Sequence, residues 1–272
     1  MGKIIAICNQ KGGVTKTTTC LNLGAGLARE GKRVALVDSD PQGDLTTALG
    51  WEGDSLDHSL GWLMYLVTQD HKPPVREAIL HHREGVDLIP SNLDLSTMES
   101  QLVNAMSREK VMANILKEIR DDYDYILIDC PPSLGMITIN ALTAADEVLI
   151  PVQAQYLPTK GMTSLMKSID KVQNHTNEDL KIAGVVMTLV DNRTNLCKEV
   201  ISRIRTEYGM HIRIFDTQIP VAIKAAEASK AGMSIFAYDE RSKPALAYEQ
   251  LTKEVVRLAE RERHRNEAAI IR

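Results

Sequence analysis

The segment from Ile4 to Thr18 constrains the fold of this chain more than any other. It begins with an apolar run, Ile4 to Cys8, and continues with the ten residues NQKGGVTKTT from Asn9 to Thr18. The residues that follow have the apolar spacing of a helix. A strand, a glycine-rich turn, a Lys-Thr pair and a helix in this order are the layout of a phosphate-binding loop. The segment therefore predicts a strand, loop and helix whose loop binds phosphate.

Each residue type in this loop has a physical role beside a phosphate group. Gly12 and Gly13 allow the backbone to turn tightly, so that its N–H groups can face an anion. The first turn of the following helix adds the positive end of the helix dipole. Lys16 is expected to reach the β- and γ-phosphates of a nucleotide, and the hydroxyl of Thr17 to bind Mg²⁺. The expected nucleotide-binding residues of the loop are Lys11, Gly12, Gly13, Val14, Thr15, Lys16, Thr17 and Thr18.

Strand-like and helix-like segments alternate along the rest of the chain. Short continuous runs of Val, Ile and Leu are typical of strands that are covered on both faces, and their alternation with helices indicates a parallel sheet. We therefore predict an α/β fold with one domain over residues 1–272, built on a mostly parallel, doubly wound β-sheet with helices on both faces. The expected strands are 4–8, 34–37, 86–89, 125–128, 148–151 and 182–189. The expected helices include 17–30, 110–120, 137–144, 161–172 and 198–208.

The composition agrees with such a core and disfavours several other classes of protein. Of the 272 residues, 44% are hydrophobic but only 4% are aromatic, so the core is expected to be aliphatic. No apolar run approaches the roughly 20 residues that a membrane span requires. The 4 cysteines lie far apart and form no C-x-x-C pair. This spacing disfavours disulfides and metal sites and favours a reducing cytoplasm.

Two segments are less regular than the rest. Residues 51–84 contain Gly61 and the pair Pro73-Pro74, and we expect a helical insertion there with a loop near the prolines. Residues 259–272 mix both signs of charge with few apolar side chains, and we expect a polar C-terminal helix or tail.

Aspartates stand where two of the expected strands end. The run VALVDSDPQGD places Asp38 and Asp40 after one strand, and YILIDCPPSLG places Asp129 after another. Ligands of doubly wound sheets bind beyond the carboxyl ends of the strands, and a carboxylate there can hold Mg²⁺ directly or through water. An aspartate in this position can also cap a turn, and that alternative stays open for Asp38.

Several motifs together resemble one known family. The form KGGVxKTT, with a second lysine at position 11, is similar to the deviant phosphate-binding loop of the ParA, MinD and nitrogenase-iron-protein class of P-loop NTPases. The runs DxDPQG at 38–43, DxPPSLG at 129–135 and TxxDxRTNL at 188–196 resemble the ParA/Soj branch. The resemblance covers residues 1–258 and implies a partitioning ATPase that uses ATP and Mg²⁺.

The resemblance also implies roles for individual residues. Lys11 would reach across an ATP-dependent homodimer to the phosphates bound by the partner copy. Asp40 would orient or activate the attacking water, so the catalytic residues would be Lys11, Lys16 and Asp40. Asp38 and Asp129 would support the metal together with the Thr17 hydroxyl.

Further roles concern adenine, DNA and a partner protein. The resemblance places the backbone at Pro220 beside the adenine, and it places Arg193 and Lys224 where the family contacts duplex DNA without sequence preference. Residues 193–272 carry 15 Lys and Arg against 11 Asp and Glu, which indicates either a basic surface or well-solvated helices. A ParB/Spo0J-like DNA-binding protein would stimulate hydrolysis, and the protein would work in the cytoplasm on the nucleoid.

Among the positions that depart from the pattern of the family, two concern residues of the expected site. The family usually has glycine before the second lysine, whereas this chain has Thr15. A β-branched residue adopts a positive φ only at a cost, so Thr15 either has a negative φ or strains the loop. Lys224 stands where the family usually has arginine, which keeps the charge but loses the bidentate geometry toward a phosphate.

Alternative functions make different demands on the sequence. A MinD-like protein that binds membranes needs a C-terminal amphipathic helix with a bulky apolar face, and residues 258–267 lack one. A nitrogenase-iron-protein-like reductase needs cysteines that hold an iron–sulfur cluster, and Cys130 has no suitable companion in the sequence. A cobyrinate-synthase-like amidase and a small-molecule kinase are the remaining alternatives, and a kinase would leave Lys11 unexplained.

Overall fold

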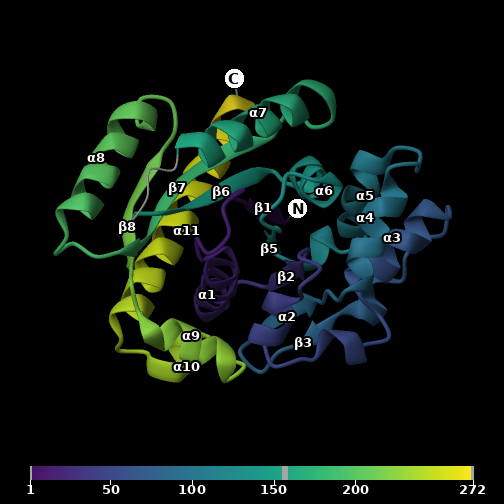
Figure 1. Cartoon of the computed structure of the whole chain (residues 1–272). Helices are drawn as coiled ribbons and strands as arrows, with labels where there is room; N and C mark the ends of the chain where they lie inside the picture. Colours follow the sequence, from purple (N-terminus) through teal and green to yellow (C-terminus); the bar gives the residue numbers. More distant parts are fainter. Residues whose placement is uncertain (1, 155–158, 271–272) are drawn as a thin grey trace.

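One β-sheet organises the structure, a computed structural model that describes residues 2–154 and 159–270. Within these residues eight strands form the sheet in the order β3-β4-β2-β5-β1-β6-β7-β8 (Figure 1). Every described pair is parallel except β3 with β4. The strands are β1 (Lys3–Ile7), β2 (Val34–Asp38), β3 (Leu80–His81), β4 (Val86–Ile89), β5 (Tyr125–Asp129), β6 (Glu147–Gln153), β7 (Lys181–Val190) and β8 (Ile214–Pro220).

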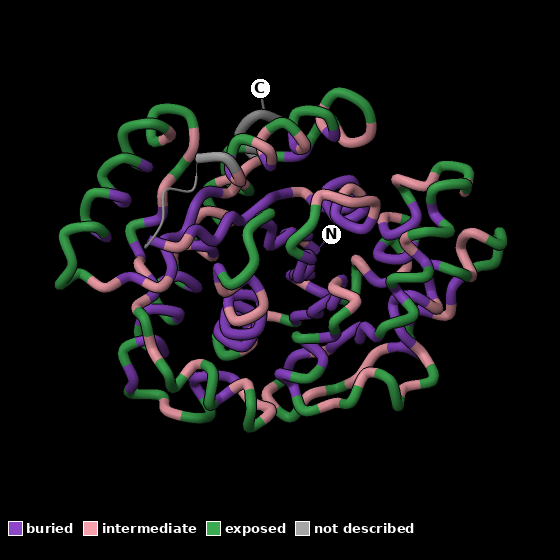
Figure 2. Tube along the Cα trace, viewed as in Figure 1, coloured by how far each residue is buried: buried purple, intermediate pink, exposed green. Residues whose placement is uncertain are grey.

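Helices cover both faces of the sheet because successive strand residues point to opposite sides. In β1, Ile5 and Ile7 pack on one side, whereas Ile4 and Ala6 pack on the other. The first side is covered by α1 (Lys16–Arg29), α2 (Asp44–Ala48), α9 (Ile223–Lys230), α10 (Ile235–Asp239) and α11 (Lys243–Ile270). The second side is covered by α3 (Leu60–Thr68), α4 (Asp94–Leu102), α5 (Val111–Lys117), α6 (Met136–Ala144), α7 (Thr159–His175) and α8 (Asn195–Tyr208). Figure 2 shows buried residues concentrated along the strands and the inward sides of these helices.

The predicted doubly wound α/β fold is confirmed, with differences at its edges. The six expected strands are present, one with the same ends (86–89) and the others with ends shifted by one or two residues. The sequence pattern missed β8, an edge strand whose polar residues interrupt its apolar ones, and the two-residue β3. It named no helix at the short elements α2, α4, α9 and α10, and it predicted only the part of α11 that begins at residue 259.

The two irregular segments have a defined structure where the structure describes them. Residues 51–84 contain α3, the 3-10 turns η1 (Gly53–Ser55) and η2 (Val75–Ala78), and β3. From residue 259 the chain continues α11 as far as Ile270, and residues 271–272 lie outside the described part. The remaining 3-10 turns are η3 (Arg108–Lys110) and η4 (Arg120–Asp122).

The sheet topology brings three loops to one edge near its centre. β1 lies between β5 and β6, and β5 separates it from β2. In the parallel register Ile7 is opposite Asp129, and Asp129 is opposite Asp38. Because these strands end level with one another, the loops after β1, β2 and β5 meet at the carboxyl edge, where doubly wound folds bind their ligands.

Candidate nucleotide-binding site

The loop from Asn9 to Thr15 connects β1 to α1 and is fixed at both of its ends. The side chain of Asn9 donates to the carbonyl oxygen of Pro151 (2.7 Å) and accepts from the backbone N–H of Lys11 (3.0 Å). The hydroxyl of Thr188, on β7, donates to the carbonyl oxygen of Val14 (3.1 Å). Strands β6 and β7 therefore hold the loop in place.

The two lysines of the loop occupy different positions. Lys16 is the first residue of α1 and is only 7% exposed, and its ammonium group donates to the carbonyl oxygen of Lys11 (3.3 Å). Lys11 is exposed, and its ammonium group donates to the side-chain oxygen of Gln153 at the end of β6 (3.1 Å). One lysine is thus enclosed by the loop, and the other lies on its outer side.

The sequence left two conformations open for Thr15, a negative φ or a strained positive φ. The structure has the strained one. Its φ of 65° and ψ of 33° lie in the left-handed region, directly before the first residue of α1. A β-branched residue there costs roughly 1–3 kcal/mol. The Thr15 hydroxyl donates to the carbonyl oxygen of Val14 (2.6 Å), a contact that partly offsets the cost.

We expect Thr15→Gly to stabilise the nucleotide-free protein by about 1 kcal/mol, because relief of strain exceeds the extra chain entropy of glycine. Urea unfolding measures this change. Thr15→Ala is the matched control, since it removes the hydroxyl and keeps the strain, and it should be less stable than Thr15→Gly. A Thr15→Gly protein less stable than the parent would show that the hydroxyl contact outweighs the strain.

Asp38 is buried and organises the loop that follows β2. Its carboxylate accepts hydrogen bonds from the backbone N–H of Thr46 (2.8 Å), the hydroxyl of Thr46 (2.7 Å) and the backbone N–H of Asp40 (3.2 Å). Burial raises the pKa of Asp38 to about 7, although these hydrogen bonds oppose the shift. An aspartate that caps a turn makes contacts of this kind. Through them Asp38 fixes the conformation of the loop that carries Asp40.

Asp129 has the environment expected of a metal ligand. It is only 1% exposed, and neither carboxylate oxygen accepts a hydrogen bond of standard geometry, although the Thr17 hydroxyl lies close enough to act on the carboxylate. Burial and the nearby charge of Asp38 raise the pKa of Asp129 well above its usual range, while the Thr17 hydroxyl and the Lys16 ammonium act in the opposite direction. A buried carboxylate whose oxygens are not fully hydrogen-bonded is costly. Mg²⁺, which prefers oxygen ligands, fits this position together with Thr17.

Asp40 lies half-buried in the same cluster. One of its carboxylate oxygens accepts from the backbone N–H of Gln42 (3.0 Å), and its own N–H is held by Asp38. Its charge acts on Asp44 and on Asp129, and the charge of Lys16 also acts on both of those carboxylates. The structure therefore brings Lys16, Asp38, Asp40 and Asp129 together at one edge of the sheet.

The three remaining predicted residues lie farther along the same edge. Pro220 ends β8 and is opposite Val190 of β7. Arg193, in the loop after β7, is paired with Asp191 (2.8 Å), and its side chain is 90% exposed. Lys224 is exposed in the first turn of α9 and is paired with Asp239. The structure does not bring these residues into the cluster around Lys16.

Sequence reasoning missed several residues that support the site. Gln153 and Thr188 belong to the runs IPVQ and TLVD, which lie near the ends of two expected strands. That position was the feature of the sequence that could have placed them beside the loop. No sequence pattern identified Thr46, because its hydroxyl reaches the carboxylate of Asp38 only when the chain turns between the two residues.

Comparisons with known proteins agree with this geometry. A family model for an AAA domain matches residues 2–182. The chain is 45% identical to the sporulation initiation inhibitor protein Soj of Bacillus subtilis, covering 94% of this chain and 98% of the relative. It is 39% identical to the chromosome partitioning protein ParA of Caulobacter vibrioides, covering 98% and 97%.

Solved structures of similar proteins contain nucleotide and metal. A cobyrinic acid a,c-diamide synthase from Mycobacterium smegmatis with bound ATP analog and magnesium has a TM-score of 0.82 at 35% identity and covers 94% of this chain and 95% of its own. The septum site-determining protein MinD from Pyrococcus horikoshii, complexed with Mg-ADP, has a TM-score of 0.73 at 25% identity and covers 95% and 98%. ATP and Mg²⁺ are accordingly the cofactors of the loop described above, and this chain belongs to the Soj/ParA family of partitioning ATPases.

Proposed function

We propose that ATP closes two copies of this protein into a dimer that binds duplex DNA without sequence preference, and that hydrolysis separates the copies and releases the DNA. The observation that carries the proposal is the division between the two loop lysines. Lys16 is enclosed by its own loop, whereas Lys11 is exposed on the outer side, where a second copy can present its nucleotide. A ParB/Spo0J-like protein on the DNA would stimulate hydrolysis, and the protein would act in the cytoplasm on the nucleoid.

The hydrolytic step requires placement and charge more than covalent chemistry. Lys16 would contact the β- and γ-phosphates, and the backbone N–H groups of the loop would hold the phosphate chain. Asp40 would orient the attacking water and accept its proton. Thr17 and Asp129 would hold Mg²⁺, which neutralises charge that develops on the phosphate oxygens.

The proposed DNA surface consists of Arg193, in the loop after β7, and Lys224, in the first turn of α9 just after the loop that follows β8. The backbone N–H of Val221 donates to the carbonyl oxygen of Val190 (3.2 Å), so the loops after β7 and β8 begin side by side. Each cation is paired with a carboxylate, but exposed ion pairs contribute only about 0–1 kcal/mol. DNA phosphates can therefore displace these carboxylates at little cost.

The deciding experiment is DNA binding by the Asp40→Ala protein, which should hold ATP without turning it over. We expect tight binding of non-specific duplex DNA with ATP and Mg²⁺, weak binding with ADP and Mg²⁺, and a steep loss of affinity with salt. Reversal of charge at Arg193 and Lys224 should weaken the binding and flatten its salt dependence. Equal binding in the two nucleotides would contradict the dimer switch, and unchanged binding by the reversed protein would place the DNA surface elsewhere.

We expect Lys11→Ala to abolish dimerisation in ATP while leaving ATP binding to the monomer largely intact, because the ammonium group of Lys11 would serve the partner's phosphates. Sedimentation in ATP and ADP measures the dimer, and nucleotide titration measures the affinity. Lys117→Ala, which removes an exposed lysine of α5, is the matched control. Dimers of Lys11→Ala in ATP would contradict its role in trans.

The alternatives find less support in the structure. Among the described residues no helix is long and apolar enough to cross a membrane. Residues 261–265 of α11 are mainly exposed and mostly charged, unlike the apolar face that a MinD-like membrane helix requires. The cysteines Cys8, Cys20, Cys130 and Cys197 are all buried, so none is presented as the nucleophile that a glutamine-dependent synthase requires.

A further inference from the structure

One buried tyrosine joins the C-terminal helix to the phosphate-binding loop. Tyr248, in the second turn of α11, is completely buried. Its hydroxyl is hydrogen-bonded to the hydroxyl of Thr19, which is also completely buried, on α1 (3.3 Å). Neither the phosphate-binding motif nor the proposed reaction assigns a role to this tyrosine.

The hydroxyl of Tyr248 also lies near Thr15, the strained residue of the loop. Burial raises the pKa of Tyr248 to about 12, and the hydroxyls of Thr19 and Thr15 both act in the opposite direction. These two threonines are one helical turn apart, and the backbone N–H of Thr19 donates to the carbonyl oxygen of Thr15 (2.8 Å). Tyr248 therefore lies against the first turn of α1, at the point where the helix follows the loop.

The hydrogen bond between Thr15 and Val14 fixes the direction of the interaction with Tyr248. The hydroxyl of Thr15 donates to the carbonyl oxygen of Val14 (2.6 Å), so toward Tyr248 its oxygen acts as an acceptor. Tyr248 is then the donor to Thr15, and it accepts from Thr19. This chain of hydroxyls ends at the carbonyl oxygen of Val14, which also accepts from the hydroxyl of Thr188 on β7 (3.1 Å).

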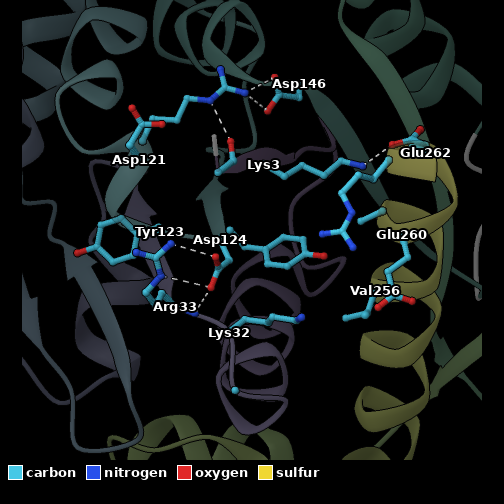
Figure 3. A pocket seen from close by; sticks show the side chains of 16 residues that line it. Lys3, Lys32, Arg33, Asp121, Tyr123, Asp124, Asp146, Val256, Glu260 and Glu262 are labelled. Atoms are coloured by element: carbon cyan, nitrogen blue, oxygen red, sulfur yellow. Dashed lines mark hydrogen bonds and ion pairs between the residues drawn. The ribbon is translucent and has the colours of Figure 1, made fainter. Parts of the chain in front are cut away.

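Helix α11 is attached to the sheet at two other places. Near the middle of the helix, the carboxylate of Glu254 accepts from the backbone N–H of Thr217 on β8 (2.9 Å). Farther along, Glu262 is paired with Lys3 of β1 (2.6 Å), beside a cavity of about 590 Å³ at the opposite edge of the sheet (Figure 3). The sheet therefore fixes the helix that carries Tyr248.

Helices α1 and α11 also approach each other closely one turn beyond Tyr248. The hydroxyl of Thr252 donates to the carbonyl oxygen of Tyr248 (2.8 Å). The same hydroxyl occupies the position that a Cβ atom at Gly26 of α1 would need. Because glycine has no Cβ, the two helices can pack together at this turn, and this contact adds to the fixed position of Tyr248.

We propose that Tyr248 is a positioning residue, which holds Thr15 in its left-handed conformation and so keeps the phosphate-binding loop in the form that binds nucleotide. A β-branched residue favours a negative φ, and a change of φ at Thr15 would turn nearby backbone N–H groups away from the phosphates. The hydroxyl of Tyr248 opposes this change. A larger fraction of binding-competent loops raises the apparent affinity by the same factor. The inference rests on nucleotide binding by the loop, and not on the proposed dimer or on DNA.

The test is a calorimetric titration with ADP and Mg²⁺, because binding of ADP requires neither the proposed dimer nor hydrolysis. We expect Tyr248→Phe, which keeps the buried ring, to lower the affinity about three- to tenfold, as for the loss of one hydrogen bond. Combined with Thr15→Gly, the same substitution should change the affinity by less than about twofold, because glycine adopts a positive φ without support.

Urea unfolding of the same proteins separates positioning from core packing. A tyrosine that only filled the core would lower the stability with and without Thr15→Gly, and would leave the ADP affinity of the folded protein unchanged. Tyr123→Phe is the matched control, since Tyr123 is also buried and its hydroxyl donates to Asp87 (2.6 Å). Tyr123 lies beside the cavity of Figure 3, and Tyr123→Phe should keep the parental ADP affinity.

Thr19→Val tests the same hydrogen bond from its other side. We expect it to lower the ADP affinity, and we expect this loss not to add to that of Tyr248→Phe, because both variants remove one shared contact. Parental affinity in a folded Tyr248→Phe protein would overturn the inference, as would an equal loss of affinity when Thr15→Gly is present. Parental affinity in Thr19→Val would also overturn it, and this variant decides the question if Tyr248→Phe does not fold.

Discussion

Alanine in place of Lys16 is expected to lower the affinity for ATP by roughly 10²–10⁴-fold. Lys16 would contact two phosphates, and each charge-assisted hydrogen bond contributes about 1.5–3 kcal/mol. The structure supports a large effect because Lys16 is only 7% exposed and begins α1 directly after the loop. Calorimetric titration with ATP and Mg²⁺ measures the change.

The same substitution also removes a contact within the loop, so stability must be measured alongside affinity. The ammonium group of Lys16 holds the carbonyl oxygen of Lys11 (3.3 Å), and alanine removes this contact. A thermal unfolding curve shows whether the protein remains folded. Lys117→Ala again serves as the control for loss of one positive charge. Near-normal ATP affinity in a folded Lys16→Ala protein would contradict the assignment of the phosphate-binding loop.

The sequence predicted the parts of the fold that local patterns determine. β1, β2 and β5 are continuous apolar runs because both of their faces are covered, and such runs are visible without any tertiary information. β8 alternates buried and less buried residues within IFDTQIP, and its place in the sheet depends on pairing with β7. Edge strands of this kind carry a weaker local pattern.

The site was predictable to the extent that its residues stand in motifs. The positions of Lys16, Asp40 and Asp129 follow from strand ends that the topology brings together. The sequence left two alternatives for Thr15, and its φ of 65° distinguishes them. Asp38 makes the contacts of a turn cap, and its support of the metal stays a prediction. The hydroxyl of Thr46 reaches Asp38 across eight residues, and the ammonium group of Lys11 reaches Gln153 on β6, and neither contact has a local pattern.

Alanine in place of Asp40 is expected to slow ATP hydrolysis by roughly 10²–10⁴-fold, the range for removal of a group that positions and deprotonates the nucleophile. ATP binding should remain, since Asp40 would contact water and not the phosphate chain. Single-turnover hydrolysis and nucleotide titration separate these two quantities. A large loss of affinity with little change in the hydrolysis rate would contradict the proposed role.

The neighbouring carboxylate of Asp44 provides the matched control for this substitution. Asp44 begins α2 and is exposed, and the charges of Asp40 and Lys16 both act on it. If only negative charge near Lys16 mattered, Asp44→Asn and Asp40→Asn would slow hydrolysis alike. We expect Asp44→Asn to retain nearly the parental rate and Asp40→Asn to lose most of it, because the backbone N–H bond to Asp38 fixes Asp40 at the carboxyl edge beside Asp129. Equal rates for the two variants would assign the effect to general electrostatics and remove Asp40 from the catalytic step.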